Sequence, residues 1–224
     1  LIGRAKSATY RTADVVGLDT MGHVIKTMQN TLPNDPWHAH FAPPAWLQGL
    51  IAKGALGQKS GAGVFKKVGK DILMLDPKSG DYIKGSGEAS ADAEGALRQR
   101  GWGDKLKSLR AADDTQSQFM WACFRDLFHY CAYHLEAIAD NARDVDLAIR
   151  WGFGWNKGPF EIWQEAGWEQ VTQWIEADIA AGKTLSNAAL PAWVKAAGRV
   201  GVHEATGSYS PASNALRARS SLPV

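Results

Sequence analysis

Apolar residues recur at every third or fourth position through most of this chain, which is the period of an α-helix. The longest such stretch runs from Gln116 to about Ala142, and Asp113-Asp114-Thr115 in front of it offers oxygens that can cap a helix. A shorter helix is predicted around 145–149. One apolar stripe on the long helix consists of Met120, Phe124, Leu127, Phe128, Cys131, Leu135 and Ile138. The pattern therefore predicts a mainly α-helical protein.

Two parts of the chain resemble each other at nearly one offset, which is 150 residues for the first three matches and 147 for the last. The matched segments are Lys6–Tyr10 with Asn156–Phe160, Val16–Asp19 with Ala166–Glu169, Val24–Ile25 with Trp174–Ile175, and Pro44–Leu47 with Pro191–Val194. Because the matches occur in the same order, they predict a tandem duplication of one helical unit.

Each predicted unit begins with an aromatic residue, Tyr10 or Phe160, that opens a short helix. A glycine, Gly17 or Gly167, ends that helix, since glycine readily turns the backbone left-handed. A longer amphipathic helix follows in both units. Leu1 aligns with Trp151, so we expect the first unit to be truncated, without a counterpart of the long helix. Its apolar face would then be uncovered, which favours self-association into a homo-oligomer. That face consists of Tyr10, Val15, Leu18, Met21 and Ile25.

The segment between the two units has a different pattern. Two short apolar runs, Ile72–Leu75 and Tyr82–Ile83, flank an Asp-Pro-Lys-Ser-Gly turn and predict a β-hairpin. Residues 85–91 are small and predict a linker, whereas 93–109 have a helical pattern. The predicted organisation is a first repeat at 1–67, a hairpin and linker helix at 68–112, a second repeat at 113–209, and a tail or linker at 210–224.

Composition narrows the function classes. Hydrophobic residues make up 45% and charged residues 21% of the chain, and the net charge is only +2. A basic stripe for nucleic acid is missing, and no apolar run approaches the roughly 18 residues of a membrane span. Cys123 and Cys131 are eight residues apart on one predicted helix, about 12 Å, which is too far for a disulfide. We expect both to be reduced, which favours a cytoplasmic protein.

Motifs for independent catalysis are also missing. His129 and His134 are five residues apart, which places them on different faces of a helix, so we expect no metal site. No Gly-x-Gly-x-x-Gly occurs, so we expect no dinucleotide site in this chain. Lys59-Ser60-Gly61-Ala62-Gly63 does not have the spacing of a nucleophile elbow.

Three segments carry a family resemblance. Residues Gly3–Asp19, which include Asp14-Val15-Val16-Gly17-Leu18-Asp19, resemble the segment Gly-Pro-Phe-x-x-x-Asp-x-x-Gly-Leu-Asp of 3-hydroxyacyl-CoA dehydrogenases. Gly152–Phe160 keeps the Gly-Pro-Phe part. Leu56–Phe65 resembles that family's Gly-x-Lys-Thr/Ser-Gly-x-Gly-Phe-Tyr motif. The chain departs from the pattern at Ala8-Thr9, where the family has Gly-Pro.

The resemblance implies a duplicated helical domain of the 6-phosphogluconate dehydrogenase C-terminal-like type, as in multifunctional β-oxidation enzymes that carry two copies. An enoyl-CoA hydratase domain would lie elsewhere in such a parent chain. It also implies NAD-dependent oxidation of 3-hydroxyacyl-CoA by the parent protein. The NAD site and the catalytic His-Glu pair would lie in a separate NAD-binding domain, so this chain alone should be inactive.

Six residues are candidates for contact with the acyl-CoA substrate or with the NAD-binding domain. Arg4, Lys6, Ser7 and Arg11 form a small basic segment that the resemblance places at the active-site cleft, although a solvated surface would explain them too. Lys59 and Ser60 could line a CoA channel, because a lysine attracts phosphate, or could simply belong to a glycine-rich turn. A non-catalytic helical protein-interaction module is the alternative function.

Overall fold

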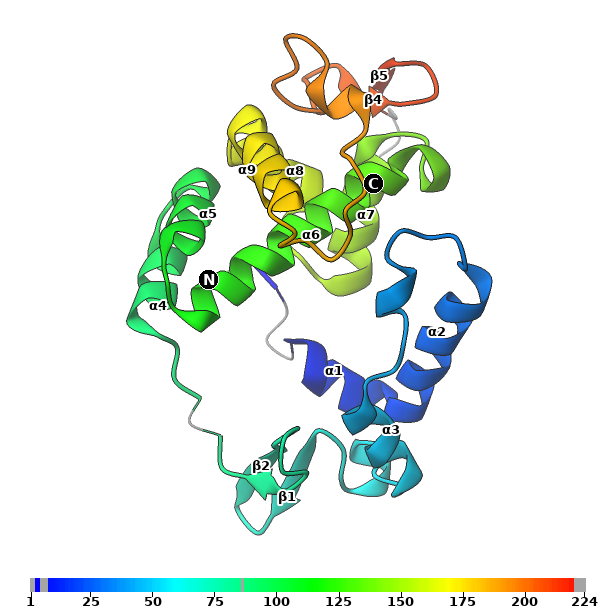
Figure 1. Cartoon of the computed structure of the whole chain (residues 1–224), viewed down its shortest axis with the longest axis vertical. Coiled ribbons are helices and arrows are strands. Elements are labelled where there is room, and N and C mark those ends of the chain that lie inside the picture. The colour runs from blue at the N-terminus through cyan, green and yellow to red at the C-terminus, as the bar shows by residue number, and fades with distance from the viewer. Residues whose placement is uncertain (1–2, 5–7, 86, 220–224) are drawn as a thin grey trace. The chain divides into compact units, whose positions relative to one another are not determined.

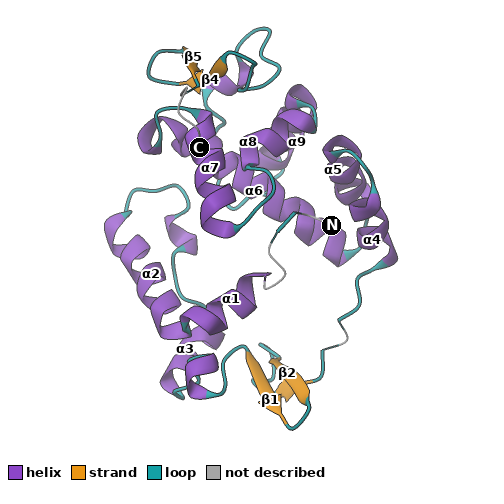
Figure 2. Cartoon of the chain, turned by 180° about the vertical axis from the view of Figure 1, so that it is seen from behind, coloured by secondary structure: helices purple, strands orange, loops and turns teal. Residues whose placement is uncertain are grey.

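The computed structural model of the chain describes residues 3–4, 8–85 and 87–219. Its regular structure is mostly helical (Figures 1 and 2), which confirms the expected mainly α fold class. The contacts divide it into two compact units, namely a small unit of residues 6–88 and a large unit of residues 1–5 and 89–224. The segment 68–112 is thus shared between them: the β-strands group with the first repeat and the helices with the second.

The small unit consists of three helices followed by a short antiparallel sheet in the order β1-β2-β3. Its elements are α1 (Ala8–Val16), α2 (Leu18–Thr31), η1 (His38–His40), α3 (Ala45–Ala52), η2 (Gln58–Ser60), β1 (Phe65–Val68), β2 (Asp71–Leu75) and β3 (Tyr82–Ile83). The expected hairpin is confirmed, because Leu75 pairs with Tyr82 and Met74 with Ile83. Strand β1 adds to it on the other side of β2, with Phe65 opposite Met74.

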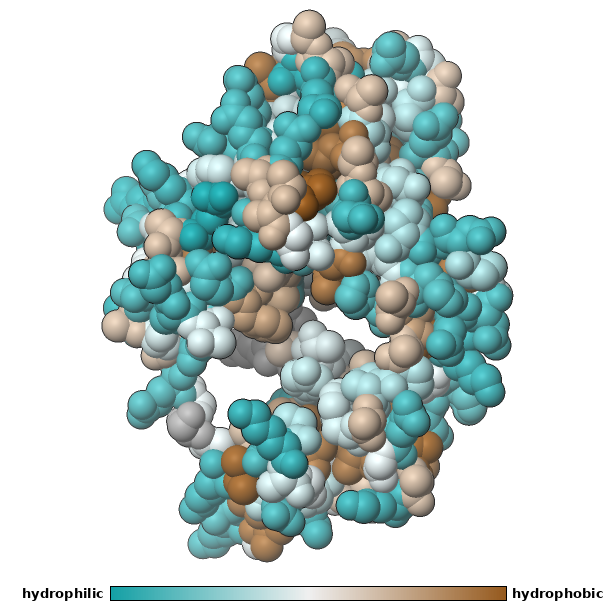
Figure 3. Space-filling view, in the orientation of Figure 1, coloured by the Kyte–Doolittle hydropathy of each residue, from teal (hydrophilic) through white to brown (hydrophobic). Residues whose placement is uncertain are grey.

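The core of the small unit is small. Leu18 and Leu47 are fully buried, and Leu50, Val64 and Leu75 are nearly so. Leu75 anchors the sheet to this core, because its backbone N–H donates to the carbonyl of Val64 at 2.8 Å. On the other face of the sheet, Ile72, Met74 and Ile83 are exposed, and Figure 3 shows apolar side chains on the surface of this unit.

The large unit surrounds the long central helix α6. Its elements are α4 (Ala91–Arg98), α5 (Trp102–Ala111), α6 (Thr115–Ile138), α7 (Ala142–Phe153), α8 (Pro159–Glu165), α9 (Trp168–Ala180), η3 (Ala192–Lys195), β4 (Gly207–Ser210) and β5 (Ala215–Ala218). The expected helix at 93–109 is divided between α4 and α5, since Gln99 leaves the helical conformation.

Helix α6 begins as the sequence predicts. The carboxylate of Asp114 accepts hydrogen bonds from the backbone N–H groups of Gln116 and Ser117, at 3.0 and 3.1 Å. The apolar stripe supplies the centre of the core through Phe124, Phe128 and Leu135, which are almost completely buried. Ile138, at the helix end, is exposed. Cys123 and Cys131 are free thiols, as expected.

Two features of the large unit differ from the expectation. Helix α7 is longer than 145–149, because Asn141 caps its first turn and Gly154 ends it with φ of 65°. Part of the expected tail is a hairpin, since β4 pairs with β5 with Ser210 opposite Ala215. This pairing escaped prediction because the strands have little apolar alternation. Tyr209 nevertheless packs on Trp193, with ring centroids 5.0 Å apart.

The matched residues of the two repeats share ring contacts and backbone conformation, although Tyr10 is exposed and Phe160 is fully buried. Tyr10 lies edge-on to Trp46 with ring centroids 5.9 Å apart, and Phe160 lies edge-on to Trp193 at 6.2 Å. Gly17 and Gly167 precede the second helix of each repeat with φ of 109° and 98°. These equivalent pairs support the duplication predicted from the offsets.

Candidate functional site

A buried carboxylate joins the two family-like motifs of the small unit. Asp14 on α1 is 4% exposed, and it accepts hydrogen bonds from the backbone N–H groups of Val64 and Phe65, both at 2.8 Å. Asp14 belongs to the first motif, and Val64 and Phe65 end the second. The carboxylate therefore fixes the start of β1 against α1, although the partners are some fifty residues apart in sequence.

The glycines of the second motif make room for α1. A Cβ atom on Gly63 would lie 2.2 Å from a carboxylate oxygen of Asp14, and one on Gly57 would lie 2.2 Å from the Asp14 carbonyl oxygen. Gly57 also has φ of 106°, which side-chain-bearing residues rarely adopt. The motif Gly-x-Lys-Ser-Gly-x-Gly thus has a steric explanation in the close approach of the turn to the helix.

Lys59 and Ser60 hold the same turn in place. The ammonium of Lys59 donates to both carboxylate oxygens of Asp19, at 2.6 and 2.7 Å, and this hydrogen bonding lowers the pKa of Asp19. The hydroxyl of Ser60 accepts from the Leu56 N–H at 2.7 Å and donates to the Ala62 carbonyl at 3.0 Å. These contacts favour a structural role for Lys59 and Ser60 in a glycine-rich turn rather than a role in lining a CoA channel.

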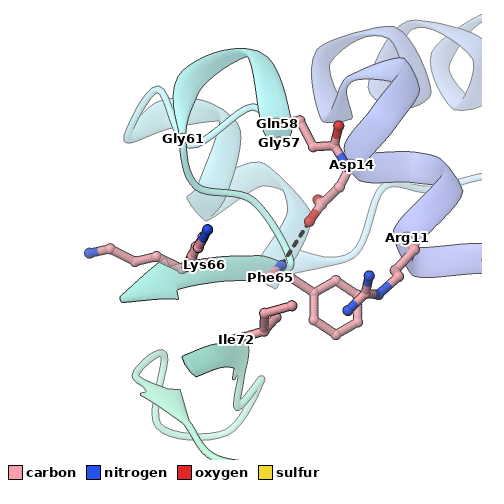
Figure 4. Close-up of a pocket in the computed structure, with 9 residues that line it drawn as sticks. Arg11, Asp14, Gly57, Gln58, Gly61, Phe65, Lys66 and Ile72 are labelled. Carbon is pink, nitrogen blue, oxygen red and sulfur yellow. Dashed lines mark hydrogen bonds between the residues drawn. The ribbon is translucent and has the colours of Figure 1, made fainter. Parts of the chain in front are cut away.

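The pocket of interest lies where this turn meets α1 and the sheet (Figure 4). It has a volume of about 310 Å³, and it is lined by Arg11, Asp14, Gly57, Gln58, Gly61, Phe65, Lys66, Lys67 and Ile72. The guanidinium of Arg11 lies over the ring of Phe65, 5.3 Å from its centroid (Figure 4). Arg11 and Lys67 therefore border a partly apolar surface, whereas the ammonium of Lys66 lies 5.4 Å from the ring centroid of Tyr82.

The other candidates are not gathered at this pocket. Arg4 is half-buried in the large unit, where its guanidinium lies 4.0 Å from the ring centroid of Trp155 and 5.4 Å from that of Phe124. Burial lowers the pKa of Arg4. Lys6 and Ser7 lie outside the described residues. Of the described candidates, Arg11 lines the pocket, together with Lys66 and Lys67, which sequence reasoning did not select.

The large unit has a related arrangement that the sequence did not predict. Gln164 occupies the position matched to Asp14, and its side-chain oxygen accepts from the backbone N–H groups of Val202 and His203, at 2.8 and 2.9 Å. His203 also contacts Asp146 through Nε2 at 2.7 Å and the hydroxyl of Ser208 through Nδ1 at 2.9 Å. Burial raises the pKa of Asp146, and the hydrogen bond from His203 opposes that shift.

This buried group of side chains has a structural role. Asp146 accepts from the Phe160 N–H at 2.8 Å and so caps α8. Its side chain and that of Ser208 are nearly fully buried. Within the described residues, no group of three or more His, Cys, Asp or Glu side chains is arranged to hold a metal ion. No described helix is both long and apolar enough to cross a membrane.

Comparison with known proteins gives a consistent result. Residues 5–67 match the family model of the 3-hydroxyacyl-CoA dehydrogenase C-terminal domain. A probable 3-hydroxyacyl-CoA dehydrogenase of Bacillus subtilis is 37% identical over 195 residues, 87% of this chain and 24% of the relative. A putative fatty acid oxidation complex trifunctional enzyme of Rickettsia felis is 23% identical over 181 residues, 76% of this chain and 23% of the relative.

A solved structure of 3-hydroxybutyryl-CoA dehydrogenase from Escherichia coli aligns with 76% of the chain and 46% of that protein, at 15% identity and a TM-score of 0.45. The chain spans about a quarter of the length of the two curated relatives described above. Residues 5–67 thus resemble the 3-hydroxyacyl-CoA dehydrogenase C-terminal domain, and 87% of the chain is similar to part of a probable enzyme of that name.

Proposed function

We propose that this chain is the carboxy-terminal part of an NAD-dependent 3-hydroxyacyl-CoA dehydrogenase of fatty-acid β-oxidation. The parent protein would oxidise the 3-hydroxyl group of an acyl-CoA to a 3-oxo group. In that protein the chain would supply packing surfaces for the NAD-binding domain and one wall of the acyl-CoA cleft.

The observation that carries this proposal is the way Asp14 connects the two motifs. Both motifs fall within the matched residues 5–67, and Asp14 accepts the backbone hydrogen bonds of Val64 and Phe65. The family-like residues thus form one structural element instead of matching by chance in separate places. The relative with 37% identity over most of this chain supports the same assignment for the large unit.

The residues of this chain do not fit NAD. A dinucleotide site of the usual kind needs a parallel β-strand, a glycine-rich turn and the amino terminus of a helix. The described strands form only antiparallel pairs, and the sequence contains no Gly-x-Gly-x-x-Gly. We therefore assign the cofactor, and the hydride transfer that it performs, to another part of the parent protein.

Of the candidate residues, Arg11 keeps a role as a substrate contact in this proposal, since it lines a pocket. Lys59 and Ser60 keep a structural role, because their side chains bind Asp19 and the turn backbone. Arg4 packs on Trp155, so its proposed part is to fasten the start of the chain to the large unit.

The proposal is tested by titrating the purified 224-residue chain with NAD and by assaying it for NADH formation from 3-hydroxybutyryl-CoA. Neither binding of NAD nor turnover is expected from the chain, whereas the parent protein should show both. If the parent protein also shows neither, the chain would instead be a non-catalytic interaction module. Turnover by the chain alone would contradict the assignment of the cofactor site.

A further inference from the structure

The pocket between α1, the 57–61 turn and the sheet has an unbalanced charge. Arg11 and Lys67 line it, and no ion pair joins either of them to a carboxylate within the described residues, whereas the ammonium of Lys66 lies on the other face of the sheet, 5.4 Å from the ring centroid of Tyr82. The acidic residue in the lining is Asp14, whose two oxygens already accept from Val64 and Phe65. The pocket therefore presents positive charge, although the chain as a whole is nearly neutral.

An apolar surface lies beside these cations. Lys67 on β1 is directly opposite Ile72 on β2, so their side chains share one face of the sheet. Phe65, two residues before Lys67, lies on that same face. Arg11 covers part of the Phe65 ring (Figure 4), an arrangement in which the cation gains from the ring while its N–H groups stay available to a ligand. Ile72 is half exposed.

Cations beside an aromatic ring and an aliphatic side chain suit an anionic group attached to a flat or apolar one. Arg and Lys bind phosphate oxygens through charge-assisted hydrogen bonds. A volume of about 310 Å³ is at the lower end of the range for small-molecule pockets, so it would hold part of a large ligand. The chemistry therefore favours a phosphorylated nucleoside.

We propose that this pocket binds the phosphorylated adenosine end of coenzyme A thioesters, with Arg11 and Lys67 as the principal phosphate contacts. This inference rests on the proposed function, which makes an acyl-CoA the substrate. The inference goes beyond the proposed function because it places the nucleotide on the small unit and assigns a role to Lys67 that no motif suggested.

The first test measures binding of coenzyme A to the 224-residue chain by calorimetry. Arg11→Gln and Lys67→Gln should each weaken binding by about two- to fivefold, the range for exposed ion pairs, and the double variant by roughly tenfold. Lys70→Gln is the matched control, since Lys70 is an exposed lysine at the tip of the same β1–β2 hairpin but outside the pocket lining. It should bind as the wild type does.

Three further ligands identify the group that is recognised. Pantetheine, which has no phosphate, should not bind, whereas 3′,5′-ADP should bind and should compete with coenzyme A. Inorganic phosphate that competes equally well would show a simple anion site and would overturn the nucleotide assignment. Binding should weaken with ionic strength. Equal affinities of wild type, double variant and control would also overturn the proposal.

The second test separates this inference from the proposed function. In the parent protein, kcat/KM is measured for 3-hydroxybutyryl-CoA and for the N-acetylcysteamine thioester, which lacks the nucleotide. The Arg11→Gln/Lys67→Gln variant should lower the ratio of these two values by roughly tenfold, and Lys70→Gln should leave it unchanged. An unchanged ratio in an active enzyme would refute the pocket assignment alone. An inactive parent protein that still binds coenzyme A through Arg11 and Lys67 would refute the proposed function alone.

Discussion

Replacing Asp14 by alanine removes the carboxylate that connects α1 with the start of β1. The side chain is buried, and its two oxygens accept the N–H groups of Val64 and Phe65. Val64 is itself buried and Phe65 partly so. After the substitution, water has little access to these two donors, so at least the N–H of Val64 would remain without a partner.

The expected loss follows from these two bonds. A hydrogen bond to a charged group contributes about 1.5–3 kcal/mol, and a buried donor without a partner costs about 1–3 kcal/mol. With one donor fully buried and the other only partly so, Asp14→Ala should lower the free energy of unfolding by about 3–5 kcal/mol. A domain is stable by only about 5–15 kcal/mol. The small unit should therefore lose a large part of its stability and unfold at a lower urea concentration than the large unit, which has its own core.

Urea unfolding followed by circular dichroism, together with limited proteolysis, measures this effect. Asp14→Ala should show cleavage within residues 6–88 under conditions where 89–224 stays intact. Asp71→Ala is the matched control in the same unit, because that carboxylate is exposed and pairs with the exposed Lys84, so its removal should change little. A difference below about 0.5 kcal/mol between Asp14→Ala and wild type would show that the two bonds do not stabilise the fold and would refute the reasoning.

Three further predictions concern the fold. Gly63→Ala should destabilise the small unit in thermal unfolding, because its Cβ would overlap the Asp14 carboxylate. Gly49→Ala, at a helical position with open space, should be neutral or slightly stabilising. Equal unfolding midpoints of the two variants would contradict the steric argument. Hydrogen bonds with Ser117 and Ser90 lower the pKa of Asp114 to about 2. The stabilisation of α6 by this carboxylate is therefore present above the unfolded pKa of about 3.9 and lost as pH falls towards 2. Asp114→Asn should reduce this acid-dependent loss of unfolding free energy, and an identical pH profile of stability in variant and wild type would count against the cap. Val15 and Val24 are exposed on α1 and α2, so the chain should self-associate in sedimentation experiments. The Val15→Lys/Val24→Lys variant should self-associate less. A wild-type chain that stays monomeric at all concentrations would overturn this expectation.

The sequence predicted those parts of the fold that depend on local interactions. The cap at Asp114 is set by residues within three positions, and the Leu75–Tyr82 hairpin by a short turn. The matching of Tyr10 with Phe160 as equivalent repeat positions followed from the 150-residue offset between the two repeats. The β4–β5 hairpin was missed because its stability depends on contacts such as Tyr209 with Trp193, which alternation within the strands does not reveal.

The candidate site was harder to predict because it depends on distant contacts. Asp14 lies in a recognised motif, but nothing in the sequence indicates that its partners are Val64 and Phe65. Lys59 has the charge expected of a phosphate ligand, yet Asp19, forty residues away, pairs with it. Lys67 lines the pocket only because β1 joins the sheet next to α1, and β1 itself was not predicted.

The most direct test of the central claim is the rate of NADH formation from 3-hydroxybutyryl-CoA by the parent protein, with and without the segment described here. The complete protein should turn over. A variant that lacks the segment but still binds NAD should show little or no turnover, because the acyl-CoA cleft would have lost one wall. Equal turnover of the two proteins, or no turnover by a complete protein that binds NAD, would contradict the account.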